Sequence, residues 1–406
     1  MHQWMTGTGL LLTLAAMGWM GQEANGQGGL PAEPLEIGLD QPQMFCDDYL
    51  VENRFNRRIL NAAVHHVLHR GTPHPDNPLL SAIKPWEQGK GINSASIVYD
   101  ERDSTFKAWY TVSPSDKSRA VGVPGSIVCY AESSDGIQWE RPALDTIEWD
   151  GEKTNIVITG EQSAAAFALI DVPAQFRRGR RFVAYQRDEK LELVSSDDGI
   201  HWREESEIFP PRQHGDGYLT VLYDETQDHF VTFLRNHMTN FHSWDERLRG
   251  NKATGSTRYI SIITSDDLWA VWDDVPRAVL IPGRGDADLF YGMPSWRYGG
   301  VFWGFLQHYD GIGNDTETLE VELVTSRDGI HWNRLDGKPM LIPFGEEGAW
   351  DAGMVNVCPY VVEVGDEWWL YYQGYGTYHN RSADANGALG LLKFRKEGFI
   401  SIRSDG

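Results

Sequence analysis

The 406-residue sequence has few cysteines, few basic residues and no long apolar stretch after its first residues. Cys46, Cys129 and Cys358 are widely spaced and match no zinc or redox spacing, so we expect three buried free thiols, with one disulfide as the alternative. Lysine and arginine total 36 against 58 acidic residues, a net charge of −22. This balance argues against nucleic acid and anionic membranes as partners.

Several catalytic signatures are also missing. The sequence contains no Gly-x-Ser-x-Gly, no glycine-rich phosphate loop ending in lysine and no His-Glu-x-x-His. The sequence therefore lacks the usual signatures of serine esterases, P-loop nucleotidases and zinc proteases. We therefore expect no cofactor and no catalytic metal, although a structural cation in a central channel is compatible with the sequence.

The N-terminal region resembles a secretory signal. Residues 1–28 contain an apolar run from Leu10 to Met20, and Ala24-Asn25-Gly26 supplies small residues for cleavage. Nothing later reaches the ~18 apolar residues of a membrane span, so no transmembrane helix is expected. The sequence thus predicts a secreted or periplasmic protein, with a Gly- and Pro-rich linker over 29–42 and a single domain over 43–406.

An octapeptide is repeated along the chain. Thr325 to Trp332 (TSRDGIHW) nearly equals Ser195 to Trp202 (SSDDGIHW), and Glu132 to Trp139 (ESSDGIQW) is a third copy. A fourth begins at Thr264 and ends, after one extra residue, at Trp272. Asp-Gly between apolar runs is a strong hairpin signal, because glycine accepts positive φ and aspartate bonds its own turn. We interpret the copies as structural, since repeats at a roughly constant period indicate a repeat architecture.

Short β-type runs lie between these hairpins, about four to a repeat and in five repeats. Such a radial pattern predicts an all-β, five-bladed β-propeller with four antiparallel strands per blade. A β-sandwich is the alternative, but it does not need a repeated Asp-Gly-x-x-Trp hairpin.

Acidic residues precede the first strand of most predicted blades. In a propeller these strands line the central channel, so the residues at their start meet on one rim. Four repeats deliver a carboxylate there, through Glu87, Asp216, Asp288 and Asp351. Converging carboxylates raise each other's pKa, which suits a general acid and a general base. For each position alone a turn or cap role is the alternative.

Aromatic and basic residues accompany these acids on the predicted rim. We expect Trp86, Tyr291 and Trp350 to form a stacking floor for sugar rings. The second strands end near further hydrogen-bonding groups, and we expect these to bind sugar hydroxyls or an acidic sugar group: Arg235, His237, His308 and His379.

Together these features resemble the five-bladed propeller glycoside hydrolases of families 43 and 32. The resemblance covers about residues 45–402 and rests on the hairpins, the acidic rim and these segments: Phe45 to Leu50, Pro85 to Glu87, Asp288 to Pro294, Ser326 to Gly329 and Trp350 to Met354. The family 32 motifs Trp-x-Asn-Asp-Pro-Asn-Gly, Arg-Asp-Pro and Glu-Cys are absent, so the family's catalytic roles are not carried onto single positions.

The sequence therefore predicts a secreted glycoside hydrolase acting on an extracellular oligo- or polysaccharide. Asp288 and Asp351 are the predicted carboxylates at the anomeric centre, Glu87 is the predicted general acid, and Asp216 would tune a pKa or hold a hydroxyl. Two carboxylates across the scissile bond are the common requirement of such hydrolysis. A non-catalytic carbohydrate-binding propeller and a protein-interaction propeller are the alternatives.

Overall fold

The structure is a computed structural model, and it describes residues 42–50, 64–114, 127–159, 167–170, 172–187, 191–207, 220–239, 256–272, 275–283, 285–312, 315–379, 381 and 386–404. The predicted signal peptide and residues 29–41 of the predicted linker lie outside these ranges. No helix within them is long and apolar enough to cross a membrane. Strands dominate the described chain, which confirms the all-β prediction.

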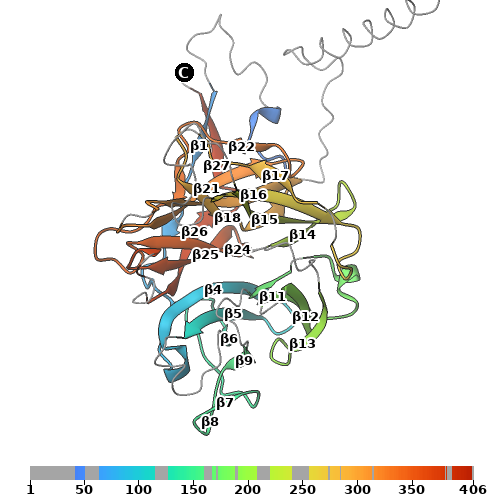
Figure 1. The fold of residues 1–406 in the computed structure, drawn as a ribbon, viewed down its shortest axis with the longest axis vertical. Coiled ribbons are helices and arrows are strands. Elements are labelled where there is room, and N and C mark those ends of the chain that lie inside the picture. Colours follow the sequence, from blue (N-terminus) through green and yellow to red (C-terminus); the bar gives the residue numbers. More distant parts are fainter. Residues whose placement is uncertain are drawn as a thin grey trace, which may run out of the picture.

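The strands form five successive groups, which we call units one to five. Unit one contains β4 (Gly89–Asp100), β5 (Thr105–Pro114), β6 (Ile127–Ser133) and β9 (Ile156–Thr159), and unit two contains β10 (Phe167–Leu169), β11 (Phe182–Arg187), β12 (Leu191–Ser196) and β13 (Arg203–Glu207). Unit three contains β14 (Val221–Asp224), β15 (His229–Thr239), β16 (Ser256–Ser265) and β17 (Arg277–Leu280). Units one and two occupy the lower half of Figure 1, and the labelled strands of unit three lie above them.

Units four and five form one larger sheet. Unit four contains β18 (Leu289–Gly292), β19 (Ser295–Tyr298), β20 (Val301–Asp310), β21 (Thr318–Ser326), β22 (Trp332–Arg334) and β23 (Met340–Ile342). Unit five contains β24 (Met354–Val364), β25 (Glu367–Tyr375) and β26 (Ala388–Arg395), and its outer strands come from the N-terminal part of the chain: β2 (Thr72–Pro73) and β3 (Leu80–Ser81). A single parallel pair, Leu319 with Met354, joins the two units.

Two small sheets and three short 3-10 helices complete the described chain. β1 (Val64–Leu68) pairs with β27 (Ile400–Ser404), near the C-terminus in Figure 1, and β7 (Glu148–Trp149) pairs with β8 (Glu152–Lys153). The 3-10 helices are η1 (Asp48–Leu50), η2 (Pro85–Glu87) and η3 (Ala174–Arg177). Two sets of strand pairs therefore connect the N-terminal and C-terminal parts of the described chain. β1 pairs with β27, and β2 and β3 pair with β26.

The repeated octapeptides form the predicted hairpins. In the second copy Ser196 Oγ accepts hydrogen bonds from the backbone N–H groups of Asp198 and Gly199, and Asp198 Oδ1 accepts from Ile200 and His201. Gly199 has a φ of 83°. The same bonds recur in the copies that end at 139 and 332. Local hydrogen bonding and positive φ at glycine therefore account for the motif, as predicted.

Each of these hairpins packs on the preceding unit. Trp109 of unit one donates its indole N–H to the Gly199 carbonyl, and Tyr371 of unit five donates to the Gly136 carbonyl. Trp332 of unit four meets Phe233 of unit three with ring centroids 5.1 Å apart. The contact of unit one with unit five favours a ring. The closed ring of five blades nevertheless stays a prediction, because the hydrogen-bonded sheets are not closed.

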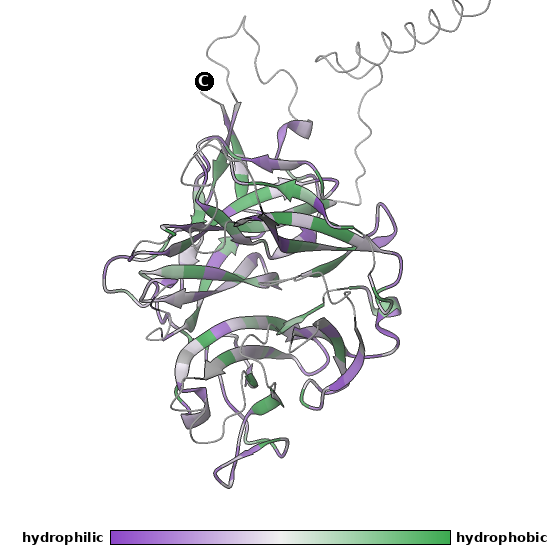
Figure 2. Ribbon diagram, in the orientation of Figure 1, coloured by the Kyte–Doolittle hydropathy of each residue, from purple (hydrophilic) through white to green (hydrophobic). Residues whose placement is uncertain are grey.

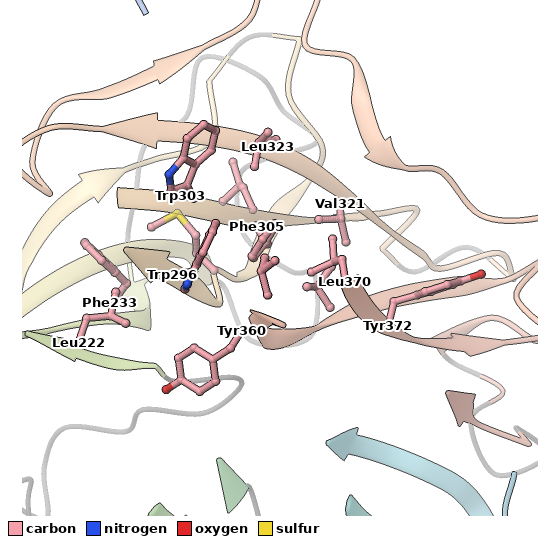
Figure 3. Close-up of a cluster of buried hydrophobic side chains, with 14 of the residues drawn as sticks. Leu222, Phe233, Trp296, Trp303, Phe305, Val321, Leu323, Tyr360, Leu370 and Tyr372 are labelled. Atoms are coloured by element: carbon pink, nitrogen blue, oxygen red, sulfur yellow. The ribbon is translucent and has the colours of Figure 1, made fainter. Parts of the chain in front are cut away.

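The core lies between the units. Apolar residues concentrate on the strands and polar residues on the connecting segments (Figure 2). Figure 3 shows one region where side chains of β14, β15, β19, β20, β21, β24 and β25 meet, including the fully buried Trp303 and Phe305. Cys46, Cys129 and Cys358 are free and buried, as expected from the sequence. Burial raises the pKa of the Cys46 thiol to about 11, so this thiol stays protonated at neutral pH.

The hairpin packing predicts a specific intolerance at Gly199. A Cβ added there would lie 2.6 Å from the Trp109 ring, whereas a Cβ at Gly337, which has a φ of 76°, would have no atom within 4 Å. We expect Gly199→Ala to lower the free energy of unfolding by about 1–3 kcal/mol more than Gly337→Ala, because only the first adds an overpacking cost to the strained φ. Urea unfolding of the two variants measures this difference, and equal losses would contradict it.

Candidate functional site

Two tyrosines and a histidine form the centre of the candidate site. Tyr291 lies on β18 and Tyr309 on β20, and their rings stack with centroids 5.4 Å apart. His379 follows β25, and its Nε2 lies 2.9 Å from the Tyr291 hydroxyl while its Nδ1 lies 3.2 Å from that of Tyr309. β18, the end of β20 and the segment after β25 therefore meet at one place.

The hydrogen bonds around His379 have a fixed direction. The Tyr309 hydroxyl donates its only proton to Glu317, so it can only accept from His379 Nδ1. His379 Nε2 then accepts from the Tyr291 hydroxyl. Burial lowers the pKa of His379, and the nearby positive charges lower it further while Glu317 raises it, which leaves a neutral ring at pH 7. Proton donation thus runs from Tyr291 through His379 and Tyr309 to Glu317.

Two arginines of unit three cover this group. The guanidinium carbon of Arg235 on β15 lies 4.5 Å from the Tyr291 ring centroid, and its Nη1 donates to the Tyr291 carbonyl at 3.0 Å. The guanidinium carbon of Arg258 on β16 lies 5.5 Å from the Tyr291 ring centroid. His237 pairs with Arg258 across β15 and β16, so both side chains project from the same face. We call Tyr291, Tyr309, Glu317, His379, Arg235 and Arg258 the central cluster.

Asp288 lies three residues before Tyr291 and next to a second carboxylate. Its Oδ2 accepts from the backbone N–H groups of Gly311 and Ile312, both at 3.1 Å. Burial raises the pKa of Asp288, and the nearby Asp310 raises it further, although the hydrogen bonds from Ile312 and Gly311 lower it. Asp288 is therefore a carboxyl group that stays protonated to a higher pH than usual.

Asp310 also lines a cavity of about 650 Å³, which we call the outer cavity. It lies against unit four and is lined by side chains that include Asp286, His308, Asp310, Glu320, Lys338 and Phe344. Burial, and to a smaller extent Asp310, raises the pKa of Glu320. Asp286 differs, because Lys338 and Arg334 donate to it and its pKa is lowered despite its burial.

His308 lies on the other face of β20 from the central cluster. Its Nε2 is 2.7 Å from Glu322 Oε2, and Arg334 donates to the other oxygen of Glu322 at 2.9 Å. Strand alternation explains this position, since Tyr309 and His308 are neighbours and project to opposite faces. His308 therefore lines the outer cavity instead of joining the other predicted binding residues.

Glu87 and Trp86 lie elsewhere, inside unit one. The carboxylate of Glu87 is fully buried and accepts from the backbone N–H groups of Ile83 and Lys84 and from the side chains of Tyr110 and Arg141. Trp86 is 5 % exposed and donates its indole N–H to Asn155 at 2.8 Å. Four donors around one carboxylate suit a structural ion pair, and the predicted roles in catalysis and stacking stay predictions.

Asp351 and Trp350 contact side chains of unit five. Asp351 Oδ2 accepts from the Tyr372 hydroxyl at 3.0 Å. The Trp350 ring centroid lies 5.3 Å from that of Tyr372, and Cβ atoms added at Gly374 or Gly390 would fall less than 3 Å from the Trp350 ring. The missing side chains of these glycines thus make room for the indole. Asp216 is outside the described residues.

The structure therefore gathers Tyr291, Arg235 and His379, with His237 nearby and Asp288 adjacent. Sequence reasoning missed four of the neighbours: Tyr309, Glu317, Arg258 and Asp310. Tyr309 and Asp310 lie at the end of a second strand, Arg258 lies near the start of a third strand, and Glu317 directly precedes one. A sequence search that covered the start of each third strand as well as the end of each second strand would have found them. Within the described residues, no group of three or more His, Cys, Asp or Glu is arranged to hold a metal.

Comparison with known proteins identifies the fold. No protein-family profile and no curated sequence matches the chain. Among solved structures it is similar to a β-1,2-mannobiose phosphorylase from Listeria innocua, at 12 % identity and a TM-score of 0.51, over 82 % of this chain and 96 % of that one. A glycosyl hydrolase from Bacteroides ovatus aligns over 84 % of this chain and 98 % of its own, at 13 % identity and a TM-score of 0.50.

A third similar structure belongs to work on the GH130 family of mannoside phosphorylases, which contains glycoside hydrolases that target β-1,2 mannosidic linkages in Candida mannan. It matches at 14 % identity and a TM-score of 0.51, over 82 % of this chain and 97 % of that one. The chain thus has a fold found in glycoside hydrolases and mannoside phosphorylases. The finer resemblance to families 43 and 32 stays a prediction.

Proposed function

We propose that the protein cleaves glycosidic bonds at the central cluster, with Asp288 as the general acid. The observation that carries the proposal is the position of Asp288, a partly buried carboxyl group three residues before a cluster of aromatic and hydrogen-bonding groups. Burial raises its pKa, which suits this role. A general acid must keep its proton near the working pH, and burial with a neighbouring like charge achieves this. The shared fold with glycoside hydrolases supports the same reaction.

The other groups of the central cluster have matching roles in this proposal. The Tyr291 hydroxyl and the two arginines offer hydrogen-bonding groups for sugar hydroxyls, because Tyr309 already stacks on the Tyr291 ring and both arginines lie over it. Glu317 is the second carboxylate, and the chain through His379 and Tyr309 leads a proton from the attacking water toward it. A separation of about 6.5–9.5 Å between the two catalytic carboxylates would mean inversion at the anomeric carbon, and about 5–5.5 Å retention. Asp351, Glu87 and Asp216 remain alternative candidates from the sequence.

Phosphorolysis is the second candidate reaction. Arg235, Arg258 and His379 lie together at the central cluster, and guanidinium groups are well suited to a phosphate oxyanion. One structure of the same fold is named as a mannobiose phosphorylase. Phosphate would then replace water as the attacking group.

A glycan panel tests both reactions. The full mature chain is incubated with neutral and acidic oligosaccharides, including β-1,2-mannobiose, with and without inorganic phosphate. We expect hydrolysis to release reducing sugar without added phosphate. A sugar phosphate is expected only if phosphorolysis is the reaction. Binding without cleavage would instead indicate the carbohydrate-binding alternative. Neither binding nor cleavage would overturn the proposal and favour a protein-interaction propeller.

The carboxyl pair predicts a defined change in pH dependence. Asp310→Asn removes the negative charge that helps to raise the pKa of Asp288, so Asp288 should lose its proton at a lower pH. Because the acid must be protonated, the alkaline limb of the kcat/KM profile should move to lower pH. Asp366→Asn, on the exposed surface of unit five, is the matched control and should leave the limb in place. An unchanged profile in Asp310→Asn would contradict the role of Asp288.

We also infer the finer fold and location from the sequence. The hairpin contacts between successive units, and between units one and five, support a five-bladed propeller over 43–406. The N-terminal apolar run supports export to the periplasm or the outside, where carbohydrate polymers are met. Protein N-terminal sequencing after expression with the leader tests cleavage near residue 28.

A further inference from the structure

The first strand of unit one contains a β-bulge near its start. Ser94 of β4 pairs with Thr111 of β5. The next residue of β5, Val112, pairs with Ile92, so Asn93 is an extra residue between the two pairs. Bulges often lie next to active sites, because they re-aim a side chain. Ile92 and Ser94 are buried, whereas Asn93 is exposed. The bulge therefore places an exposed carboxamide between two buried residues.

The start of β4 is fixed against unit five. Gly91 forms a β-bridge with Gly387, the residue before β26, and a Cβ added at Gly91 would lie 2.2 Å from the backbone nitrogen of Gly387. The Tyr375 hydroxyl, at the end of β25, donates to the Ile92 carbonyl at 3.0 Å. The same hydroxyl lies 3.2 Å from the Asn93 carbonyl and 3.4 Å from the side-chain oxygen of Asn93. A close backbone approach and one tyrosine therefore hold Asn93 in position.

Tyr375 also connects Asn93 to the central cluster. Its side chain is buried and belongs to one packed apolar group with Tyr309, and Tyr291 packs against that group. The ring of Tyr375 thus packs with the tyrosines of the central cluster, while its hydroxyl lies beside Asn93. Unit one therefore brings an exposed hydrogen-bonding group next to a site whose other residues come from units three, four and five.

We propose that Asn93 binds one hydroxyl group of the sugar at the central cluster and makes the enzyme selective for the configuration of that hydroxyl. A carboxamide donates and accepts hydrogen bonds and carries no charge, which suits a sugar hydroxyl. The bulge and Tyr375 fix its position, as recognition of one configuration requires. This inference rests on the proposed function and deepens it, because it adds a specificity-determining residue from unit one.

Deoxy sugars test this role, because each analogue lacks one hydroxyl group. The probes are the disaccharide best cleaved in the panel and its monodeoxy analogues, and the full mature chain is used. Asn93→Ala should lower kcat/KM for the parent disaccharide roughly two- to tenfold, the loss of about one hydrogen bond. It should lower kcat/KM equally for the analogues that keep the recognised hydroxyl, and leave the analogue that lacks it unchanged. An equal loss on the parent and every analogue would indicate a structural role and overturn the proposal, as would no loss.

A control variant and a binding measurement keep the two proposals separable. Gln138→Ala removes an exposed carboxamide of the same unit and should change nothing. Gln138 lies at the other end of the sheet, because it follows Ser133, which pairs with Phe106 near the β4–β5 turn.

Calorimetry measures binding of the same sugars, with the tightest-bound disaccharide as the parent if none is cleaved. Binding that Asn93→Ala weakens for the parent but not for one analogue, with no cleavage, would support Asn93 and overturn the proposed reaction. Cleavage that Asn93→Ala leaves unchanged, or lowers equally for all the sugars, would overturn the role of Asn93 and leave the reaction standing. Neither binding nor cleavage would overturn both.

Discussion

Replacing Asp288 with asparagine is expected to lower kcat for glycan cleavage by about two to four orders of magnitude, the range that a positioned general acid supplies. Asparagine cannot protonate the leaving oxygen. It can still accept the hydrogen bonds from the backbone N–H groups of Gly311 and Ile312, so the fold should persist. The measurement is reducing-sugar release under saturating substrate, together with the thermal unfolding midpoint of the variant.

The same assay separates Asp288 from the other predicted carboxylates. Asp351→Asn and Asp366→Asn are measured in parallel, because the first is a sequence-based candidate and the second an exposed residue of the same unit. Asp351 accepts from Tyr372 of unit five, which is not part of the central cluster, so we expect a much smaller loss there. A large loss in Asp351→Asn with full activity in Asp288→Asn would transfer the catalytic role to Asp351.

The all-β architecture was predictable because its hairpins are local. Asp198 and Ser196 satisfy the turn with bonds two or three residues away, so the motif carries its own structure. The outer strands of unit five were not predictable in this way. β2 and β3 are two residues long each, too short for any period, and they are strands only because the distant β26 offers its edge.

The candidate site was predictable in part for a related reason. Tyr291 and Arg235 lie on strands that the hairpin spacing locates. Arg258 belongs to the site because of the register in which β16 pairs with β15. Glu317 belongs to it because the segment after β25 brings His379 beside it. The sequence shows neither of these. The side of a strand also matters: a shift of one residue separates Tyr309 in the central cluster from His308 in the outer cavity.

Glu87 shows how a buried partner changes an interpretation. Its carboxylate meets Arg141, 54 positions later in the chain, with Nε 2.9 Å from Oε1. Spacing cannot reveal such a pair, and without it an acid at the start of a first strand is a reasonable candidate for catalysis. Once the Arg141 partner is known, a structural role explains Glu87, and the two interpretations predict different results for the same variants.

Arg141→Met is expected to lower the free energy of unfolding by about 3–5 kcal/mol, because it leaves the Glu87 carboxylate buried without its cation. Methionine keeps much of the side-chain length, so the loss reports the charge more than the volume. Urea unfolding measures the change, with Arg102→Met on the exposed β4–β5 turn as the matched control, expected within about 0.5 kcal/mol of wild type.

The double variant Arg141→Met with Glu87→Met decides between the two roles of Glu87. Removing both charges should regain part of the lost stability, since apolar replacements of a buried pair are often tolerated. The recovery should be incomplete, because the backbone N–H groups of Ile83 and Lys84 lose their acceptor. If the folded double variant still cleaves glycans, the pair is structural. A folded but inactive double variant would restore Glu87 as the general acid and displace Asp288.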